Sequence, residues 1–182
     1  MEEFVEILDE KGKPTGKTAP KAEAHRLGLF HPTIHVWFYQ PPGQVLLQQR
    51  AKVKDTYPLL WDVSVAGHVH AGETIEAAAI REVKEEIGLD IHPDSLEKIG
   101  VFKSVHKHRA DLVDCEFHHT FLSRLPVPLA ALKKQETEVA SLKMVPLLQF
   151  AEETWGLARP QKYVPHATSY YKAVIKAIKA RL

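Results

Sequence analysis

The chain has 182 residues, with 24 Lys and Arg against 23 Asp and Glu, a net charge of +1 with neutral histidines, and 45% hydrophobic residues. This length and composition predict one globular domain and exclude wholesale disorder. The near-neutral charge argues against a nucleic-acid polymer or an anionic membrane as the partner, since both usually require a basic excess. The count of eleven histidines is the one unusual feature.

The cysteine count and the start of the chain indicate a cytoplasmic protein. Cys115 is the only cysteine, so an internal disulfide is excluded and a reducing compartment is favoured. The chain has no apolar run approaching the ~18 residues that span a bilayer. Its acidic first ten residues lack the basic start and apolar core of a signal peptide.

The first thirty residues predict a strand hairpin followed by a short helix. An apolar segment over 4–8 precedes turn residues at 9–12, which would fold the chain back over 14–17. Pro20 then fits the first turn of a helix that stops at Gly28.

The middle of the chain predicts strands and one long helix. Apolar runs over 34–39 and 45–49 flank a Pro–Gly turn and predict a hairpin with at least one buried strand. One of Trp37 and Phe38 is expected in the core. A further strand is expected over 61–65 and a helix over 74–87. Within that strand, Trp61 could line a pocket or pack in the core.

The second half predicts three more strands and two closing helices. The strands are expected over 98–107, 114–122 and 139–145, and the helices over 147–153 and 169–180. Residues Tyr171, Val174, Ile175 and Ile178 repeat at helical spacing and would pack on the core. Mostly antiparallel strands with a few helices on their faces are typical of the α+β class.

Three carboxylates share one sector of the helix over 74–87 at ~100° per residue. They belong to Glu82, Glu85 and Glu86, and Glu86 lies at the edge of the apolar stripe formed by Ile75, Ala79, Val83 and Ile87. Like charges at this spacing repel, and desolvation adds to the cost. A hard divalent cation, Mg2+ by default, is the simplest compensation. The alternative is a solvated acidic face paired with Arg81 and Lys84.

Residues 67–89 resemble the Nudix box, a loop–helix–loop motif of pyrophosphate-processing enzymes. The pattern that carries the resemblance is Gly67-x5-Glu73-x7-Arg81-Glu82-Val83-x-Glu85-Glu86-x-Gly88-Leu89. The resemblance implies a Nudix fold, an α/β/α sandwich around a mixed sheet, in a single domain over 1–182. That domain would comprise an N-terminal hairpin and helix extension over 1–30, the box over 67–89 and C-terminal helices over 147–182.

The resemblance also implies roles for the box residues. Glu82, Glu85 and Glu86 would bind Mg2+, with Mn2+ as an alternative, together with the carbonyl group of Gly67. Glu82 or Glu85 would activate water, and Glu73 and Arg81 would orient the helix. Independently of the resemblance, a glycine at position 67 suits a loop whose backbone approaches a metal closely. A glycine at position 88 suits a left-handed helix stop.

Segments outside the box resemble isopentenyl-diphosphate isomerase, a branch of the Nudix fold. They are VEILDEKGKPTGKT near the start, EAHRLGLFHPTIHVWFY over 23–39, residues 45–50 and residues 57–61. The resemblance implies a second metal site at His25, His31, His68, Asp114 and Glu116, and diphosphate contacts at Lys21, Arg50 and Lys54. Imidazole ligands suit Zn, Mn or Fe better than Mg. Surface or capping histidines, and a solvated basic cluster that includes Lys52, are the alternatives.

One departure separates this chain from the isomerases. Isomerisation of the double bond needs proton transfer by a cysteine, and that position is Ala66 here. Cys115 lies next to Glu116 on another strand and is a poor substitute. The Nudix box is also intact, whereas the isomerases usually have an eroded one. The chain therefore resembles isomerase-like Nudix hydrolases more closely.

The function expected from the sequence is Mg2+-dependent hydrolysis of a P–O–P bond in an organic diphosphate, for example a nucleoside diphosphate derivative. A glutamate of the box or Glu116 would activate water, and Arg50 and Lys54 would hold the phosphates. The alternatives are isopentenyl-diphosphate isomerase and a non-catalytic module that binds a diphosphate metabolite. A homodimer is compatible with the family.

Several remaining residues lie outside any motif. His70, His106, His108, His118 and His119 are interpreted as structural or surface residues, and His118 and His119 should face opposite sides of their strand. The segment Tyr163–His166 is expected to be a loop, where an aromatic ring closing over the substrate is a less favoured alternative.

Overall fold

The computed structural model describes residues 1–155 and 161–182. Residues 156–160, within the predicted C-terminal segment 147–182, lie outside the described part. The strands are β1 (Phe4–Leu8), β2 (Pro14–Pro20), β3 (His31–Gln40), β4 (Gln44–Arg50), β5 (Trp61–Asp62), β6 (Val65–His68), β7 (Glu97–Arg109), β8 (Leu112–Arg124) and β9 (Val139–Pro146). The helices are α1 (Lys21–Leu27), α2 (Ile75–Ile87), α3 (Leu147–Thr154) and α4 (Thr168–Lys179).

The main sheet is mixed. Its strands follow the order β5-β4-β3-β8-β7, with β6 also paired to β3 and β9 to β4. Strands β3 and β8 run parallel, from the pair His31 and Glu116 to the pair Tyr39 and Arg124, and the other pairs are antiparallel. The central strand β3 therefore pairs with three different strands along its length.

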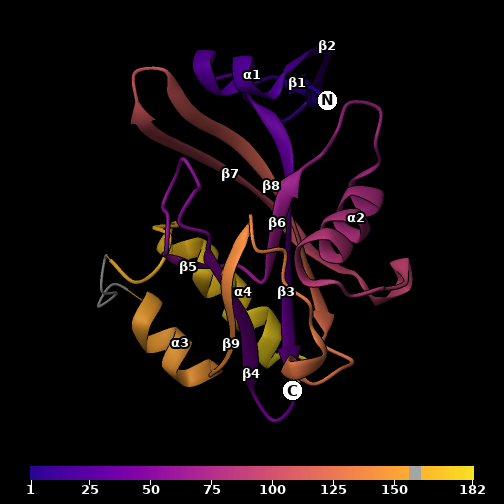
Figure 1. Ribbon diagram of the computed structural model, residues 1–182, viewed down its shortest axis with the longest axis vertical. Helices are drawn as coiled ribbons and strands as arrows, with labels where there is room; N and C mark the ends of the chain where they lie inside the picture. Colours follow the sequence, from indigo (N-terminus) through magenta and orange to yellow (C-terminus); the bar gives the residue numbers. More distant parts are fainter. Residues whose placement is uncertain (156–160) are drawn as a thin grey trace.

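Two hydrophobic cores lie on the two faces of this sheet. Side chains alternate between the faces of a strand, so Trp37 and Phe38 of β3 enter different cores, and both are fully buried. Helices α3 and α4 cover the face of Trp37, and α2 covers the other face (Figure 1). This arrangement is the expected α/β/α sandwich around a mixed sheet.

The region predicted as one strand over 61–65 forms two. Trp61 and Asp62 pair with β4, whereas Val65 begins the pairing with β3. The chain crosses between these neighbours at Val63 and Ser64. The hydroxyl of Ser64 supports the crossing, because it donates to the Leu46 carbonyl (2.5 Å) and accepts from the Phe38 N–H (2.9 Å).

The N-terminal extension packs against one end of the sheet. Strands β1 and β2 form a separate two-stranded sheet, and with α1 they lie at the top of Figure 1, near the start of β3. Gly28 ends α1 in the left-handed conformation, with φ of 64°, as its position predicts. This close return brings His25 of α1 next to His31 at the start of β3.

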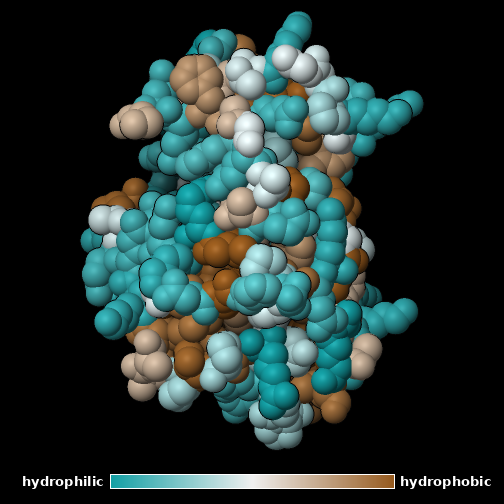
Figure 2. Space-filling model, turned by 90° about the vertical axis from the view of Figure 1, so that its right-hand side faces the viewer, coloured by the Kyte–Doolittle hydropathy of each residue, from teal (hydrophilic) through white to brown (hydrophobic). Residues whose placement is uncertain are grey.

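The surface on the α2 side is mostly hydrophilic, with apolar atoms gathered near its middle (Figure 2). Within residues 1–155 and 161–182, none of the helices is both long and apolar enough to cross a membrane.

Candidate active site and metal centres

A cavity of about 430 Å³ opens where the N-terminal extension, the sheet and α2 meet. Its volume falls within the usual range for small-molecule sites. The sequence-predicted residues on its wall are Lys21, His25, Arg50, Lys54, Gly67, His68, Arg81, Glu82, Glu85, Glu86, Asp114 and Glu116. The fold thus gathers residues from both halves of the chain at one site.

Helix α2 presents its carboxylates to this cavity. Its start is capped by Thr74, whose hydroxyl accepts from the Ala77 N–H (3.2 Å), and Gly88 ends it with φ of 68°. Glu86 is buried and accepts hydrogen bonds from the side-chain amide of Gln48 (2.7 Å) and the N–H of Ala66 (3.3 Å). Burial and the neighbouring charge of Glu82 raise the pKa of Glu86 to about 8.

Glu82 lies against the backbone of Gly67. A β-carbon at Gly67 would stand 2.1 Å from Cδ of Glu82, so a larger residue at position 67 would displace this carboxyl group. Burial raises the pKa of Glu82 to about 7, although Arg81 opposes the shift. Glu85 is half exposed, with an oxygen 3.4 Å from Nη1 of Arg81.

Arg81 connects the loop before α2 to the acidic face of the helix. Its guanidinium donates to both carboxylate oxygens of Glu73, at 2.9 and 3.0 Å, and to the carbonyl of His68 at 2.9 Å. It also donates to Glu82 at 2.7 Å. Such a bidentate pair fixes the angle between loop and helix.

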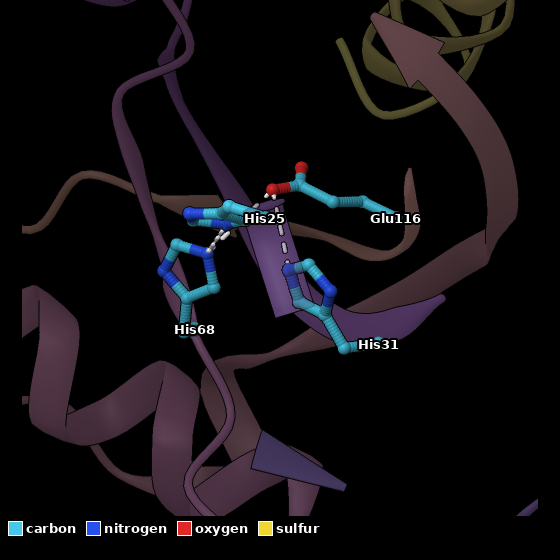
Figure 3. A group of neighbouring side chains, drawn as sticks. All are labelled: His25, His31, His68 and Glu116. Carbon is cyan, nitrogen blue, oxygen red and sulfur yellow. Dashed lines mark hydrogen bonds and ion pairs between the residues drawn. The ribbon is translucent and has the colours of Figure 1, made fainter. Parts of the chain in front are cut away.

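Four side chains form a compact group of metal-ligand type beside these glutamates (Figure 3). They are His25, His31, His68 and Glu116, with one potential ligand atom from each lying within 4.8 Å of the others. Nε2 of His25 is 3.2 Å from Nε2 of His68, and Nε2 of His31 and of His68 are each 3.6 Å from the same Glu116 oxygen.

The hydrogen bonds of the group suit a cation. Nδ1 of His31 is 2.8 Å from the Leu29 carbonyl, which can only accept, so Nδ1 carries the proton. Nε2 of His31 is buried and has no hydrogen-bond partner in the described chain. Burial, together with His68 and His31, lowers the pKa of His25 to about 4, so this imidazole is neutral at pH 7, as a ligand must be.

Asp114 lies outside this group of four. Its carboxylate bonds with Nε2 of His108 at 2.8 Å and is 3.8 Å from Nε2 of His25. The structure therefore brings four of the five predicted ligands together and places Asp114 beside them.

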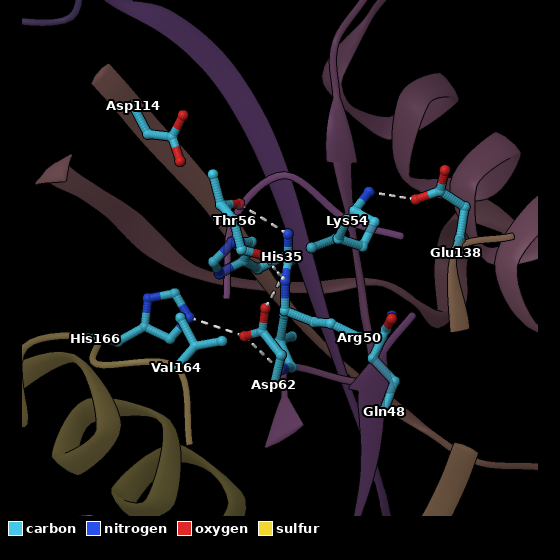
Figure 4. Close-up of polar contacts among 12 residues, drawn as sticks. His35, Gln48, Arg50, Lys54, Thr56, Asp62, Asp114, Glu138, Val164 and His166 are labelled. Atoms are coloured by element: carbon cyan, nitrogen blue, oxygen red, sulfur yellow. Dashed lines mark hydrogen bonds and ion pairs between the residues drawn. The ribbon is translucent and has the colours of Figure 1, made fainter. Parts of the chain in front are cut away.

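The three predicted phosphate-binding cations line the cavity, each with an acidic partner. Lys21 pairs with Glu3, and Lys54 pairs with Glu138 (Figure 4). Arg50 donates to the carbonyl (2.9 Å) and hydroxyl (3.0 Å) of Thr56 and to Asp62 (3.3 Å). Lys52 is exposed and does not belong to the wall.

Several cavity residues were missed in the sequence. His70, His106 and His118, interpreted from the sequence as structural or surface residues, lie on the cavity wall, and His35 and His166 join them. Strand period gives a signal for two of these: His35 shares the inward face of β3 with His31, and His118 shares that of β8 with Glu116. His119 lies on the opposite face, 3.2 Å from Lys98, as expected.

Three other expectations are resolved by the packing. Tyr163 is buried and donates to Glu153 (2.8 Å), so Val164 and His166 of that loop line the cavity instead of an aromatic ring. Trp61 packs partly buried against the core. Ala66 lines the cavity, whereas Cys115 is buried outside it.

Comparison with protein families shows what kind of domain this is. The model of the NUDIX domain matches residues 29–167. The chain therefore belongs to the Nudix family, and its domain is that of a pyrophosphohydrolase.

Curated relatives place the chain in the isomerase-like branch. It is 38% identical over 153 residues to Nudix hydrolase 3 of Arabidopsis thaliana, covering 82% of this chain but only 20% of that protein. It is 32% identical over 203 residues to an uncharacterised Nudix hydrolase of Clostridium acetobutylicum, covering 97% of each. It is 37% identical over 166 residues to an isopentenyl-diphosphate Delta-isomerase of Nocardia farcinica, covering 88% of each.

Solved structures share the fold at low identity. A crystal structure from Deinococcus radiodurans superposes with a TM-score of 0.70 at 17% identity, covering 93% of this chain and 98% of that one. The NUDIX domain of Shewanella oneidensis NrtR, crystallised with ADP ribose, superposes with a TM-score of 0.56 at 16% identity, covering 82% and 86%.

Proposed function

We propose that the protein hydrolyses a P–O–P bond of an organic diphosphate, such as a nucleoside diphosphate derivative, with Mg2+ or Mn2+ at the α2 carboxylates. The observation that carries this proposal is the pair of carboxylates of Glu86, which is buried, and Glu82, which is largely buried, on a cavity that also holds Arg50 and Lys54. A fold relative crystallised with ADP ribose, itself an organic diphosphate, supports this substrate class.

The donor set of α2 fits a hard divalent cation. Glu82, Glu85 and Glu86 offer carboxylate oxygens, and Gly67 lies on the same wall. Both hydrogen bonds that Glu86 accepts from the described residues come from neutral donors, so a negative charge on Glu86 would lack a close cation there. When bound, the cation would supply charge neutralisation and Lewis-acid polarisation of a phosphoryl oxygen.

The protein's own residues would perform the other tasks. Arg50 and Lys54, with Lys21 across the cavity, would bind and orient the phosphates. Glu85, which is half exposed, Glu82 and Glu116 are the candidates to accept the proton of the attacking water. Arg81 and Glu73 would act as positioning residues that hold α2 against the loop.

The histidine group defines a second proposed metal site. His25, His31, His68 and Glu116 would hold a softer cation such as Zn, Mn or Fe, because three of the four donors are imidazole nitrogens. Asp114 would act next to this site, through His108 and His25.

The same histidine group favours isopentenyl-diphosphate isomerase as a second candidate function. Against it, the methyl group of Ala66 transfers no proton, and Cys115 is buried outside the cavity. Deuterium incorporation into dimethylallyl diphosphate, formed from isopentenyl diphosphate in heavy water, would reveal isomerisation. We expect none, and a useful rate would overturn the hydrolase proposal.

Hydrolysis is tested by a phosphate-release screen with Mg2+ and Mn2+ across nucleotide sugars, dinucleotides, nucleoside di- and triphosphates and prenyl diphosphates. Glu85→Gln and Glu86→Gln should lower kcat by about a hundredfold or more. Glu76→Gln, an exposed residue of the first turn of α2, is the matched control and should leave kcat unchanged. Tight nucleotide binding without turnover would instead indicate a binding module.

A further inference from the structure

A contiguous set of polar side chains on the cavity wall includes none of the groups assigned to the proposed hydrolysis, although Asp62 accepts a hydrogen bond from Arg50. We call it the histidine wall; it comprises Thr33, His35, Asp62, His118 and His166. His35 is the cross-strand partner of Ala66, so the wall begins where the Nudix loop does. The rings of His35 and His118 stack at 4.0 Å between centroids, and His166 lies edge-on to His35 at 5.4 Å.

Ring nitrogens of His118 and His166 have unused hydrogen-bonding capacity. Nδ1 of His118 is 2.7 Å from the hydroxyl of Thr33, but its Nε2 is buried without a partner in the described chain. Nε2 of His166 bonds with Asp62 at 2.9 Å, and the described residues provide no hydrogen bond to its Nδ1 (Figure 4). Leaving a buried polar atom without a hydrogen-bond partner costs about 1–3 kcal/mol, so a ligand that bonds to such an atom removes this cost and binds more tightly.

The side chains behind the wall hold it in place. The hydroxyl of Tyr170 is 2.5 Å from Nδ1 of His35 and accepts from the indole N–H of Trp37 at 2.9 Å. Tyr170 and Trp37 are themselves buried in the core beneath α4. The wall is therefore a preorganised surface, which lowers the entropic cost of binding.

The charge state of the wall suits neutral groups rather than a second anion. Burial, with His118 and His166 nearby, holds the pKa of His35 well below its usual range, so this ring is neutral. Asp62 stays ionised. Burial alone would raise its pKa, but the hydrogen bond from His166 and the charge of Arg50 outweigh burial and lower the pKa below its usual value. A carboxylate on the wall repels an additional phosphate and accepts readily from a hydroxyl.

We propose that the histidine wall binds the organic group of the substrate and selects one that carries hydroxyl groups, such as a ribosyl or sugar group, over an isoprenyl chain. This inference rests on the proposed function for the diphosphate end of the substrate. An isoprenyl chain would cover the nitrogens of His118 and His166 without bonding to them, whereas hydroxyl groups bond to both.

The test compares hydroxylated diphosphates with prenyl diphosphates. For at least one of ADP-ribose, UDP-glucose and ADP, kcat/KM should exceed the values for isopentenyl and geranyl diphosphate by about tenfold or more. His118→Phe should lower that ratio at least about tenfold, and His118→Gln should restore part of it. His119→Phe, one residue along but on the opposite face of β8, is the matched control and should leave the ratio unchanged.

Binding separates this inference from the proposed hydrolysis. Calorimetry with the same compounds and Mg2+, in the Glu85→Gln background, measures selectivity without cleavage. Selective binding of a hydroxylated compound that is lost in His118→Phe supports the inference. If neither class is cleaved but this selective binding is seen, only the hydrolysis proposal fails. Should His118→Phe not fold, His166→Leu tests the second nitrogen. Equal handling of both classes, or binding of neither, overturns the inference.

Discussion

The carboxyl group of Glu82 occupies the space that a side chain at Gly67 would need. A β-carbon there would lie 2.1 Å from Cδ of Glu82 and 2.3 Å from its Oε1. The atom displaced belongs to the end of a flexible side chain, so the fold can accommodate the change while the carboxylate moves. The glycine of the Nudix box is therefore needed for the position of a carboxylate.

Gly67→Ala should consequently separate activity from stability. We expect kcat to fall by about a hundredfold, because a displacement near 1 Å is enough for such a loss, with the thermal midpoint nearly unchanged. Steady-state kinetics and thermal unfolding measure the two effects. Gly16→Ala gives the opposite control: φ is 77° there and none of the described residues lies within 4 Å of the added carbon, so stability falls by about 1 kcal/mol while activity persists. Full activity of Gly67→Ala would contradict the assigned role of Glu82.

Glu86→Gln should stabilise the metal-free protein at alkaline pH. The folded pKa of Glu86 is about 8, raised by burial from 4.5, so the unfolded chain releases this proton first as the pH rises. The free energy of unfolding of the natural protein therefore declines between about pH 4.5 and 8, and the variant escapes that loss. Urea unfolding with a chelator should show little difference at pH 4.5 and a gain of about 2 kcal/mol or more at pH 8.

The half-exposed Glu85 supplies the comparison for that measurement. Glu85→Gln should change the free energy of unfolding by less than about 0.5 kcal/mol at either pH, because water solvates its charge. Adding Mg2+ should stabilise the natural protein more than the Glu86→Gln variant. A pH-independent difference between Glu86→Gln and the natural protein would show that folding does not raise the pKa of Glu86.

His31→Gln should empty the second metal site. His31 is fully buried, with Nδ1 fixed by the Leu29 carbonyl, so its Nε2 can point only into the group of four ligands. Protein purified without a histidine tag should contain Zn, Mn or Fe by elemental analysis. The metal content of the variant should be at least about tenfold lower. His92→Gln, an exposed histidine paired with Asp94, should retain the metal. A metal-free natural protein with full Mg2+-dependent activity would eliminate this site.

The linear motifs of the sequence identified the acidic face, because the chemistry of the Nudix box lies within one loop and one helix. The spacing predicted helix α2 to within a residue: Thr74, the first residue of the predicted range, is the cap that precedes the helix. His25, His31 and His68 could be associated only through the isomerase resemblance, since they lie on α1, β3 and β6 and meet through tertiary packing.

The histidine wall was not predicted, because sheet topology creates it. The parallel pairing of β3 with β8 sets Thr33 opposite His118, and the sequence pattern favoured mostly antiparallel strands. His166 reaches the wall only because Tyr163 before it turns into the core. Strand direction and loop packing are set by contacts between distant segments, which local pattern does not encode.

Arg50→Lys should weaken substrate binding more than catalysis. Three of the five N–H donors of Arg50 are used by Thr56 and Asp62, which leaves two for phosphate oxygens in a fixed orientation. A lysine keeps the charge but loses this planar geometry, so we expect KM for the diphosphate to rise by about tenfold while kcat changes by less than about threefold. Initial-rate kinetics distinguish the two constants. Lys52→Ala, in the same basic segment but exposed and off the cavity wall, should leave both unchanged. An equal effect of the two substitutions on KM would mean that general positive charge, and not the anchored guanidinium, holds the phosphates.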